Sequence, residues 1–360
     1  MQKFIKQFPV LSQYTYVNTA TSGLLYDGLL DWRQEHDLDF LIGGSTMKME
    51  GHRLISETRN SVGKFFGCKT DNVALVPNFS IGLNLLLEGL EPKGKVLLLE
   101  GDYPSLNWPF ESRGHATYFL KVTDALEENI YDRIKLDNIN VLALSLVQWL
   151  NGIKVDLGFL RNLKKDFPDL LIIGDGTQFL GTESFNFEDS GIDVLGASSY
   201  KWLLGGYGNG FMMFADGAPV KFKVKATGFN AAGGDIEGRE KVSFAKQFEP
   251  GHLDTFNFGS LNYSLGFLNE VGMDIISEQI KKLALKAKGE LENLGLLEES
   301  VVKRKVHSSI FNIQGNKDLF AKFMEHDVVC AQRGNGIRLS FHFYNTENEI
   351  DKIIGILKSS

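Results

Sequence analysis

The sequence has little cysteine. Cys68 and Cys330 are the only two in 360 residues, and no CxxC pair occurs. Two isolated cysteines do not make a disulfide framework or a cysteine-based zinc site, and they fit a protein of the reducing cytoplasm. The seven histidines follow no HxH or HxxxH spacing. The sequence therefore predicts neither disulfide bonds nor a bound metal ion.

Long hydrophobic runs and an excess of positive charge are also missing. No apolar run approaches the roughly 18–20 residues that a membrane-spanning helix needs, and the N-terminal residues 1–18 have no sustained apolar core like that of a signal peptide. The 38 Lys and Arg residues against 45 Asp and Glu give a net charge of −7, which argues against binding to nucleic acid. The length favours one large globular domain with a smaller second one.

Six short apolar runs predict strands, and most end in polar or glycine-rich residues. They cover residues 73–77, 95–102, 140–148, 169–175, 193–199 and 210–215. Most are continuous rather than alternating, as expected for strands that are buried on both faces of a mostly parallel sheet. Helical patterns at 80–90 and 156–167 lie between them. This order predicts an α/β fold with helices on both faces of the sheet.

From about residue 260 the pattern changes and predicts a smaller C-terminal α+β domain. A long amphipathic helix is expected over 261–296, and the last helix should begin with a capping box formed by Thr346 and Glu349. The other expected elements are strands within 308–315, 328–332 and 336–343 and a helix over 317–326. We therefore divide the chain into an N-terminal segment, a large domain and a small domain, over residues 1–22, 23–258 and 259–360.

Several polar side chains follow the predicted strands, at the edge where open α/β sheets bind ligands. Ser80 begins a helix, where it can act as an N-cap or help to bind an anion. Asp175 ends a buried strand and needs a cationic partner there. Lys201 follows the next strand. The two could form a simple salt bridge, or a desolvated Lys201 with a lowered pKa could attack an aldehyde.

Together these positions match the requirements of one cofactor, pyridoxal phosphate. That cofactor needs a phosphate cradle, an aromatic ring to stack on its pyridine face, a carboxylate for its ring nitrogen, and a lysine for the Schiff base. The residues available for these tasks are Ser80, Ser198 and Tyr200 for the phosphate, Tyr103 for stacking, Asp175 for the nitrogen and Lys201 for the Schiff base.

Nearly the whole sequence resembles the class V branch of the fold-type-I pyridoxal-phosphate enzymes. This branch includes cysteine desulfurases, selenocysteine lyases, isopenicillin N epimerase-like proteins and kynureninases. The matching motifs are FPVLSQYTYVNTATSG (8–23), VPNFSIGLNLLL (76–87), EGDYPSLNWPF (100–110), GDGTQ (174–178), SSYKW (198–202), FEPGHLDTFNFGSL (248–261) and IRLSFHFYNTENEID (337–351). The resemblance implies a seven-stranded-type sheet in the large domain, and a homodimer whose active site lies at the subunit interface.

The resemblance also implies residue roles. Lys201 would form the Schiff base and later move the Cα proton, Asp175 would pair with the pyridine nitrogen, and Arg338 would bind the substrate α-carboxylate. The other implied contacts are Gln178 to the ring hydroxyl, Tyr103 as the stacking ring, Ser80, Ile81, Ser198 and Tyr200 at the phosphate, His252 from the partner subunit, and Asn18 and Ser22 on the substrate side. Either Gln148 or Trp149 would face the ring hydroxyl, and the sequence leaves this open.

The cysteines depart from the pattern of the desulfurases, which need a cysteine nucleophile on a mobile loop well before the substrate-binding arginine. Cys330 lies only eight residues before Arg338, in an apolar run, and reads as a buried strand residue. We therefore expect a cytoplasmic pyridoxal-phosphate enzyme, an aminotransferase or lyase that acts at the α-carbon of an amino acid or related amine. The alternatives are a desulfurase, selenocysteine lyase or epimerase of the same family, and a non-catalytic regulatory protein that binds the cofactor.

Overall fold

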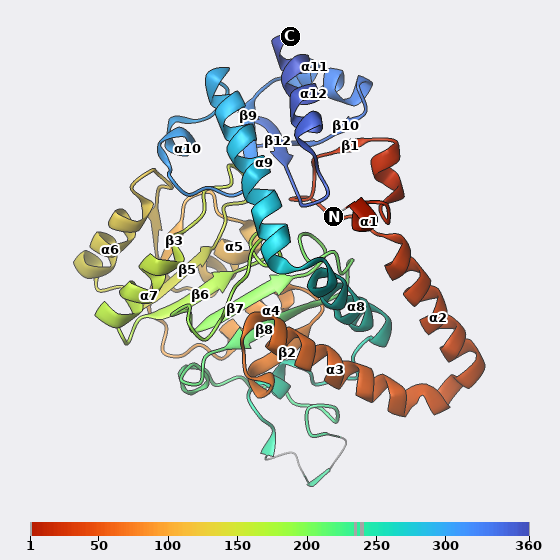
Figure 1. The fold of residues 1–360 in the computed structure, drawn as a ribbon. Helices are drawn as coiled ribbons and strands as arrows, with labels where there is room; N and C mark the ends of the chain where they lie inside the picture. Colours follow the sequence, from red (N-terminus) through yellow and green to blue (C-terminus); the bar gives the residue numbers. More distant parts are fainter. Residues whose placement is uncertain (1, 234–235, 238–240, 360) are drawn as a thin grey trace.

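A seven-stranded sheet forms the centre of the molecule (Figure 1). The computed structural model describes residues 2–233, 236–237 and 241–359. The strand order is β2-β8-β7-β6-β5-β3-β4, with β8 antiparallel to both its neighbours and the other pairs parallel. The bounds are β2 Val73–Val76, β3 Lys95–Leu99, β4 Ala116–Leu120, β5 Val141–Ser145, β6 Leu171–Asp175, β7 Val194–Ser198 and β8 Gly210–Phe214. The predicted α/β fold with a mostly parallel sheet is confirmed.

Six of these strands fall within the six apolar runs of the sequence, and β4 does not. The six are buried almost throughout, so their sequences are continuously apolar. Strand β4 lies at the edge of the sheet and is partly or fully exposed along its length. Its sequence, ATYFL, therefore shows no buried run and was missed.

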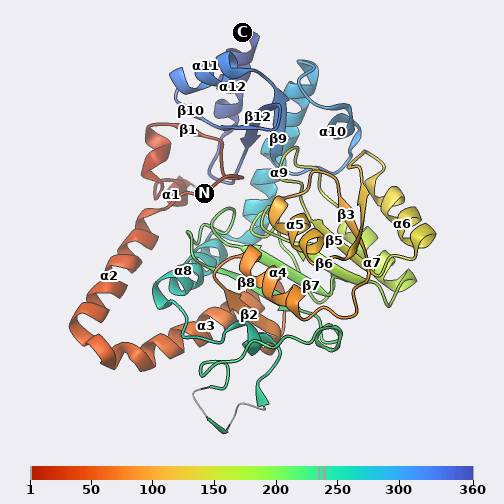
Figure 2. The ribbon, with the colours of Figure 1, turned by 180° about the vertical axis from the view of Figure 1, so that it is seen from behind.

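Helices cover both faces of this sheet (Figure 2). The helices on one face are α4 Phe79–Glu88 and α5 Pro104–Ser112, and those on the other are α3 Lys48–Phe66, α6 Leu126–Asp137, α7 Leu157–Asp166 and α8 Thr255–Val271. Successive residues of a strand serve the two cores in turn. In β3, for example, Leu97 packs into the α3/α6/α7/α8 side and Leu98 into the α4/α5 side. The sheet is therefore shielded from water except at its ends and edges.

The C-terminal part packs a small sheet, in the order β11-β12-β9, against helices. Its elements are α9 Met273–Asn293, α10 Glu299–Lys303, β9 Ile310–Gln314, α11 Lys317–Glu325, β10 Val328–Val329, β11 Ala331–Arg333, β12 Gly336–Ser340 and α12 Glu347–Lys358. The predicted capping box of Thr346 and Glu349 is confirmed. The single long helix expected over 261–296 is instead α8 and α9, separated at Gly272, whose φ of 93° is the left-handed backbone that glycine adopts readily.

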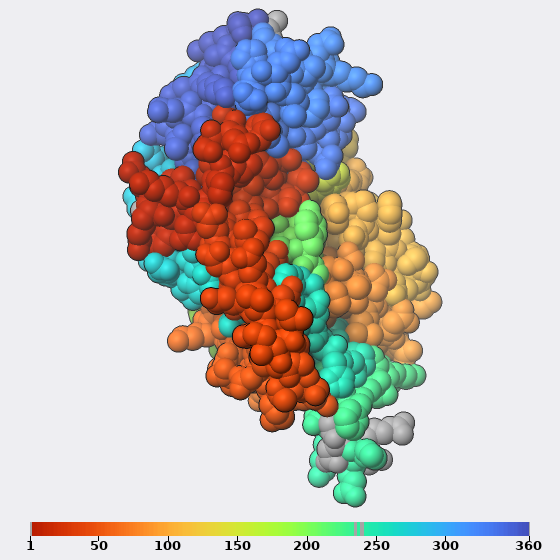
Figure 3. Space-filling view, turned by 90° about the vertical axis from the view of Figure 1, so that its right-hand side faces the viewer, coloured from red at the N-terminus to blue at the C-terminus, as the bar shows by residue number. Residues whose placement is uncertain are grey.

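The N-terminal segment lies against the C-terminal part, as Figure 3 shows in red and blue. Its elements are α1 Gln2–Ile5, η1 Pro9–Ser12 and β1 Thr15–Tyr16, and β1 pairs in parallel with β10. The chain then runs into α2 Asp27–Gly43 and η2 Gly44–Met47, while the remaining short turns are η3 Thr70–Asn72, η4 Pro219–Lys221 and η6 Ala245–Phe248. The division into residues 1–22, 23–258 and 259–360 stays a proposal, and its second boundary falls inside α8.

No helix within the described residues is both long and apolar enough to span a membrane.

Candidate active site

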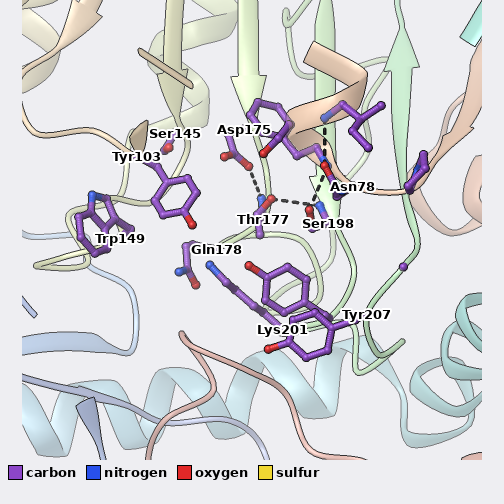
Figure 4. A pocket seen from close by; sticks show the side chains of 16 residues that line it. Asn78, Tyr103, Ser145, Trp149, Asp175, Thr177, Gln178, Ser198, Lys201 and Tyr207 are labelled. Atoms are coloured by element: carbon purple, nitrogen blue, oxygen red, sulfur yellow. Dashed lines mark hydrogen bonds between the residues drawn. The ribbon is translucent and has the colours of Figure 1, made fainter. Parts of the chain in front are cut away.

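A cavity of about 460 Å³ opens at the carboxyl ends of β5, β6 and β7, beside the first turn of α4 (Figure 4). The predicted residues that line it are Ser80, Ile81, Tyr103, Asp175, Gln178, Ser198, Tyr200 and Lys201. Its wall also contains Trp149, one of the two alternatives that the sequence left open, and residues that the sequence analysis did not assign: Asn78, Ser145, Thr177, Tyr207 and Gly208. Asn78 and Thr177 lie within the quoted motifs, whereas Ser145, Tyr207 and Gly208 lie outside them, so the motifs marked only part of the wall.

Lys201 is buried in the wall of this cavity, and within the described residues it forms no ion pair. Only 6 % of the residue is exposed, and no carboxylate oxygen in the described part of the chain lies within 4.0 Å of its Nζ atom. Nζ lies 5.6 Å from the ring centre of Tyr103 and 5.5 Å from that of Tyr200. Burial lowers the pKa of Lys201, although the charge of Asp175 partly opposes this. The simple salt bridge between Lys201 and Asp175 is therefore not formed.

Asp175 is a buried carboxylate that has no cationic partner among residues 2–233, 236–237 and 241–359. Its Oδ1 accepts a hydrogen bond of 2.8 Å from the backbone N–H of Thr177. No Lys, Arg or His nitrogen among the described residues lies within 4.0 Å of it. Burial raises the pKa of Asp175, and the hydrogen bonds from Thr177 oppose that effect. A cation placed against this carboxylate would lower the pKa again, which is what a protonated ring nitrogen does.

The first turn of α4 forms a cradle suited to a phosphate group. The Asn78 side chain accepts a hydrogen bond of 2.9 Å from the N–H of Ile81 and so caps the helix. The N–H of Phe79 donates to Ser198 Oγ at 3.0 Å, which ties the helix start to the end of β7. Ser80 also lines the cavity here. A helix N-terminus with hydroxyl groups around it attracts anions.

Gln178 is held from two sides by residues outside the cavity. Its amide nitrogen donates to the carbonyl of Ala20 at 2.9 Å, and its amide oxygen accepts from the indole N–H of Trp202, also at 2.9 Å. The ring of His342 in turn contacts the carbonyl of Trp202 at 3.0 Å. These bonds leave the second N–H of Gln178 for a group in the cavity. Trp202 follows Lys201 directly, and its sequence position gave no sign of this role.

Trp149 lines the cavity, whereas Gln148 does not. The buried amide of Gln148 donates to Asp102 Oδ2 at 3.2 Å, so the structure does not support its expected contact with the cofactor. The ring of Trp149 meets the ring of Tyr103 nearly edge-on, with centres 5.6 Å apart at 74°. Its indole N–H donates to the carbonyl of Gly101 at 2.9 Å. The cavity lining favours Trp149, and the contact of either residue with the cofactor stays a prediction.

Arg338 is placed beside this cavity by strand β12. It is only 3 % exposed, and its two terminal nitrogens donate to the carbonyl of Trp149 and to Thr21 Oγ1, each at 2.7 Å. Burial lowers its pKa to about 10. Its Nε and the side-chain oxygen of Asn18 are both buried, and neither has a hydrogen-bond partner among the described residues. Such unpaired atoms are costly, so a polar ligand at this position would be stabilising.

Two further predicted residues lie outside the cavity wall. Ser22 donates to the carbonyl of Gly23 at 3.2 Å and is only partly buried. His252 is exposed, and its ring stacks on that of His52 with centres 6.1 Å apart. The expected role of His252 in the site of a partner subunit stays a prediction.

The two cysteines are free and buried, and neither lines the cavity. Burial raises the pKa of both Cys68 and Cys330 to about 12, so neither thiol is ionised near neutral pH. Among the described residues, no cluster of three or more His, Cys, Asp or Glu side chains could hold a metal ion.

The residues present fit pyridoxal phosphate. The unpaired carboxylate of Asp175, the unpaired amine of Lys201 and the helix start at Ser80 face one cavity, and each lacks the partner that this cofactor would provide. A desolvated lysine at the carboxyl edge of a mostly parallel α/β sheet is suited to binding a carbonyl-bearing cofactor.

The family follows from comparison with known proteins. Residues 41–353 match the model of the family described as aminotransferase class-V, and the chain belongs to this family. The resemblance inferred from the motifs is thus confirmed. The protein is a pyridoxal-phosphate-dependent enzyme, a transferase or lyase that acts at the α-carbon of an amino acid or related amine.

Two relatives in sequence are distant but cover nearly the whole chain. The chain is 23 % identical over 357 residues to the uncharacterized aminotransferase YcbU of Bacillus subtilis (strain 168), covering 97 % of this chain and 95 % of the relative. It is 22 % identical over 395 residues to a probable cysteine desulfurase of Ureaplasma parvum serovar 3, covering 99 % and 96 %.

Solved structures share the fold over nearly their full length. The cysteine desulfurase of Thermococcus onnurineus NA1 superposes with a TM-score of 0.85 at 18 % identity, covering 99 % of this chain and 97 % of that one. The cystine C–S lyase C-DES, solved with its product cysteine persulfide, superposes with a TM-score of 0.86 at 17 % identity, covering 98 % and 99 %. At these identities the likeness establishes the fold.

Proposed function

We propose that this enzyme removes the α-proton of an amino acid with Lys201 and then carries out transamination or elimination without using a protein thiol. The observation that carries the proposal is the pair of buried, unpaired groups on one cavity, the Lys201 amine and the Asp175 carboxylate. A lysine kept from ion pairing, with a pKa lowered by burial, is suited to moving protons near neutral pH.

Each residue then has a defined task. When bound, pyridoxal phosphate supplies an electron-accepting ring that stabilises negative charge at the α-carbon of the substrate. Asp175 would hold the ring nitrogen in its protonated form, and the start of α4 at Ser80 would hold the phosphate group. Arg338 would bind the α-carboxylate of the substrate with its guanidinium fork. Lys201 would take the α-proton at Nζ and return it later in the reaction.

The buried cysteines favour transamination or elimination over a desulfurase reaction that uses a protein cysteine. A thiol with a raised pKa carries little thiolate at neutral pH and is a poor nucleophile. A C–S lyase needs no such thiol, and C-DES, one of the proteins with this fold, is named as a cystine C–S lyase. A protein that only bound the cofactor would not need Lys201, Asp175 and Arg338 together, so we also favour catalysis over a purely regulatory role.

We further propose that the enzyme is a homodimer of the cytoplasm with its active site at the subunit interface. Ile81 and Tyr207 support this, because both line the cavity and yet are 50 % and 63 % exposed in the single chain. A second copy covering these apolar side chains would close the cavity from water. Two free cysteines with no disulfide fit a reducing compartment.

The proposed proton transfer can be tested by hydrogen exchange. The holoenzyme is incubated with each amino acid in D₂O, and loss of the α-proton signal is followed by NMR. Lys201→Ala should slow the exchange of any accepted amino acid by at least about 100-fold, a common loss when a catalytic acid–base group is removed. The control Lys165→Ala, at an exposed position on α7, should exchange like the unaltered enzyme.

Two outcomes would contradict the proposal. Exchange that persists in Lys201→Ala would show that another group moves the proton. Release of sulfide from cysteine that disappears in Cys330→Ala would show that a protein thiol takes part after all.

A further inference from the structure

The C-terminal hairpin presents two arginines on one face, and only Arg338 has a role in the proposed function. Strands β11 and β12 pair antiparallel, with Ala331 opposite Arg338 and Arg333 opposite Gly336. Residues directly opposite each other share a face, as do residues two apart in one strand. Arg333 and Arg338 therefore lie on the same face as diagonal neighbours, with a typical Cα separation of about 7–8 Å.

This face of the hairpin adjoins the wall of the active-site cavity. Arg338 donates to the carbonyl of Trp149, which lines the cavity. The tip of the hairpin is fixed as well, because the side chain of Asn312 donates to the carbonyl of Arg333 at 3.0 Å. Gly334 at the tip lies beside Leu150, the residue after Trp149. Arg333 is thus held on a rigid support next to the proposed substrate site.

The two guanidinium groups are in contact with no counter-charge in the part of the chain that the structure describes. Within residues 2–233, 236–237 and 241–359, no Asp or Glu oxygen lies within 4.0 Å of Arg333 or Arg338. Arg333 is half-exposed, and its Nη1 donates to the carbonyl of the neighbouring Gln332. Its positive charge contributes to lowering the pKa of Lys201 and of Arg338, so its field reaches the cavity. Two uncompensated cations beside one site attract a ligand with two anionic groups.

We propose that Arg333 binds a second carboxylate, at the end of the substrate side chain, so that the enzyme prefers acidic amino acids. The inference rests on the proposed function, in which Arg338 takes the α-carboxylate. A dicarboxylic substrate compensates the charge of both arginines, whereas a substrate with an uncharged side chain leaves the charge of Arg333 uncompensated. Arg333 would act as a specificity-determining residue and not as an acid or base.

Isosteric substrate pairs test the preference. The concentration that half-saturates α-hydrogen exchange is measured for aspartate against asparagine and for glutamate against glutamine. At least one acidic member should bind tighter than its amide. Arg333→Gln should weaken the binding of that acidic substrate about tenfold or more, as expected for loss of one charge-assisted hydrogen bond. The binding of the corresponding amide should change little. Arg333→Lys should retain most of the preference for the acidic substrate. Arg161→Gln, a control at an exposed position on α7, should retain all of it.

A second readout does not depend on turnover. Calorimetry compares the binding of succinate with that of butyrate, which has the same length and one carboxylate. Succinate should bind tighter to the unaltered holoenzyme, and Arg333→Gln should remove the difference while Arg161→Gln keeps it.

The two failures are distinguishable. If exchange occurs but Arg333→Gln weakens aspartate and asparagine equally, or glutamate and glutamine equally, Arg333 does not read the side chain and the inference is overturned. If no amino acid exchanges its α-proton while succinate still binds through Arg333, the proposed function fails and the anion site stands.

Discussion

Single side chains explain why this cavity is reactive. Lys201 and Asp175 are both buried, both face the same space, and neither has an ion-pair partner within the described residues. Burial disfavours the charged form of each, which lowers the pKa of the lysine and raises that of the aspartate. Their mutual attraction opposes both shifts. The protein therefore holds two poorly solvated groups, the Lys201 amine and the Asp175 carboxylate, where one bound cofactor could interact with both.

The shifted pKa of Lys201 predicts an unusual pH profile in the cofactor-free protein. Only the neutral amine reacts with acetic anhydride, so the labelling rate rises as pH passes upward through the pKa. Because burial lowers that pKa, the midpoint for Lys201 should lie well below the ordinary lysine value of about 10.4. Peptide mass spectrometry after brief labelling gives the rate at each pH.

Asp175→Asn provides the check on this reasoning. The charge of Asp175 raises the pKa of Lys201, so removing it should move the midpoint to still lower pH. A midpoint at the ordinary value, or one that moves upward in Asp175→Asn, would contradict the assigned cause.

At the scale of elements, the start of α4 connects helix capping to phosphate binding. Asn78 caps this helix through Ile81, and Ser198 at the end of β7 accepts from Phe79. The cap fixes the first turn, and the first turn points its N–H groups and its positive dipole end towards the cavity. One short sequence, PNFSI, thus provides both the helix start signal and the proposed anion site.

Removing the cap should weaken cofactor binding, because the phosphate group of the cofactor would lose part of its site. Asn78→Ala should lower the free energy of unfolding by about 1 kcal/mol. It should also weaken the binding of pyridoxal phosphate several-fold, with a smaller effect on the binding of pyridoxal, which has no phosphate. Asp156→Ala is a matched control, because Asp156 caps α7 by accepting from Phe159 at 3.0 Å. It should cost similar stability and leave cofactor affinity unchanged. Fluorescence titration measures both affinities, and equal weakening of the two ligands would argue against a phosphate site here.

On the scale of the whole molecule, the site is assembled from parts far apart in the sequence. The large sheet provides Asp175 and Lys201, the C-terminal hairpin provides Arg338, and the N-terminal segment provides Asn18 and Thr21. Strand β1 pairs with β10, and Asn18 bridges to Ser340, so the two chain ends form one support. The proposed substrate side of the cavity therefore depends on contacts between both ends of the chain.

Much of this arrangement is readable from the sequence, for physical reasons. Strands buried on both faces leave continuous apolar runs, and a residue at or just after the end of such a run falls at the ligand-binding edge, as Asp175 and Lys201 do. Features that depend on how side chains pack in three dimensions cannot be predicted from the sequence in this way. Trp149 lines the cavity while Gln148 does not, because the Gln148 amide forms a buried hydrogen bond to Asp102 instead. The position of Arg333 beside the cavity depends on the register of the hairpin strands.

The proposed dimer gives a prediction at the same scale. Light scattering should report twice the mass of one chain. Ile81→Asp should shift this towards the monomer, because a charge would be buried in the interface. Leu136→Asp, an equally drastic change at an exposed position on α6, should leave the mass unchanged. A monomer in the unaltered protein would contradict the proposal.

The central claim is that Lys201 is the residue that reacts with the cofactor. The most direct measurement is peptide mass spectrometry after the holoenzyme is reduced with borohydride, which fixes the covalent link between lysine and cofactor. The added mass of the cofactor should lie on the peptide that contains Lys201, and Lys201→Ala should carry none. Cofactor fixed on a different lysine, or none fixed on the unaltered protein, would contradict the account.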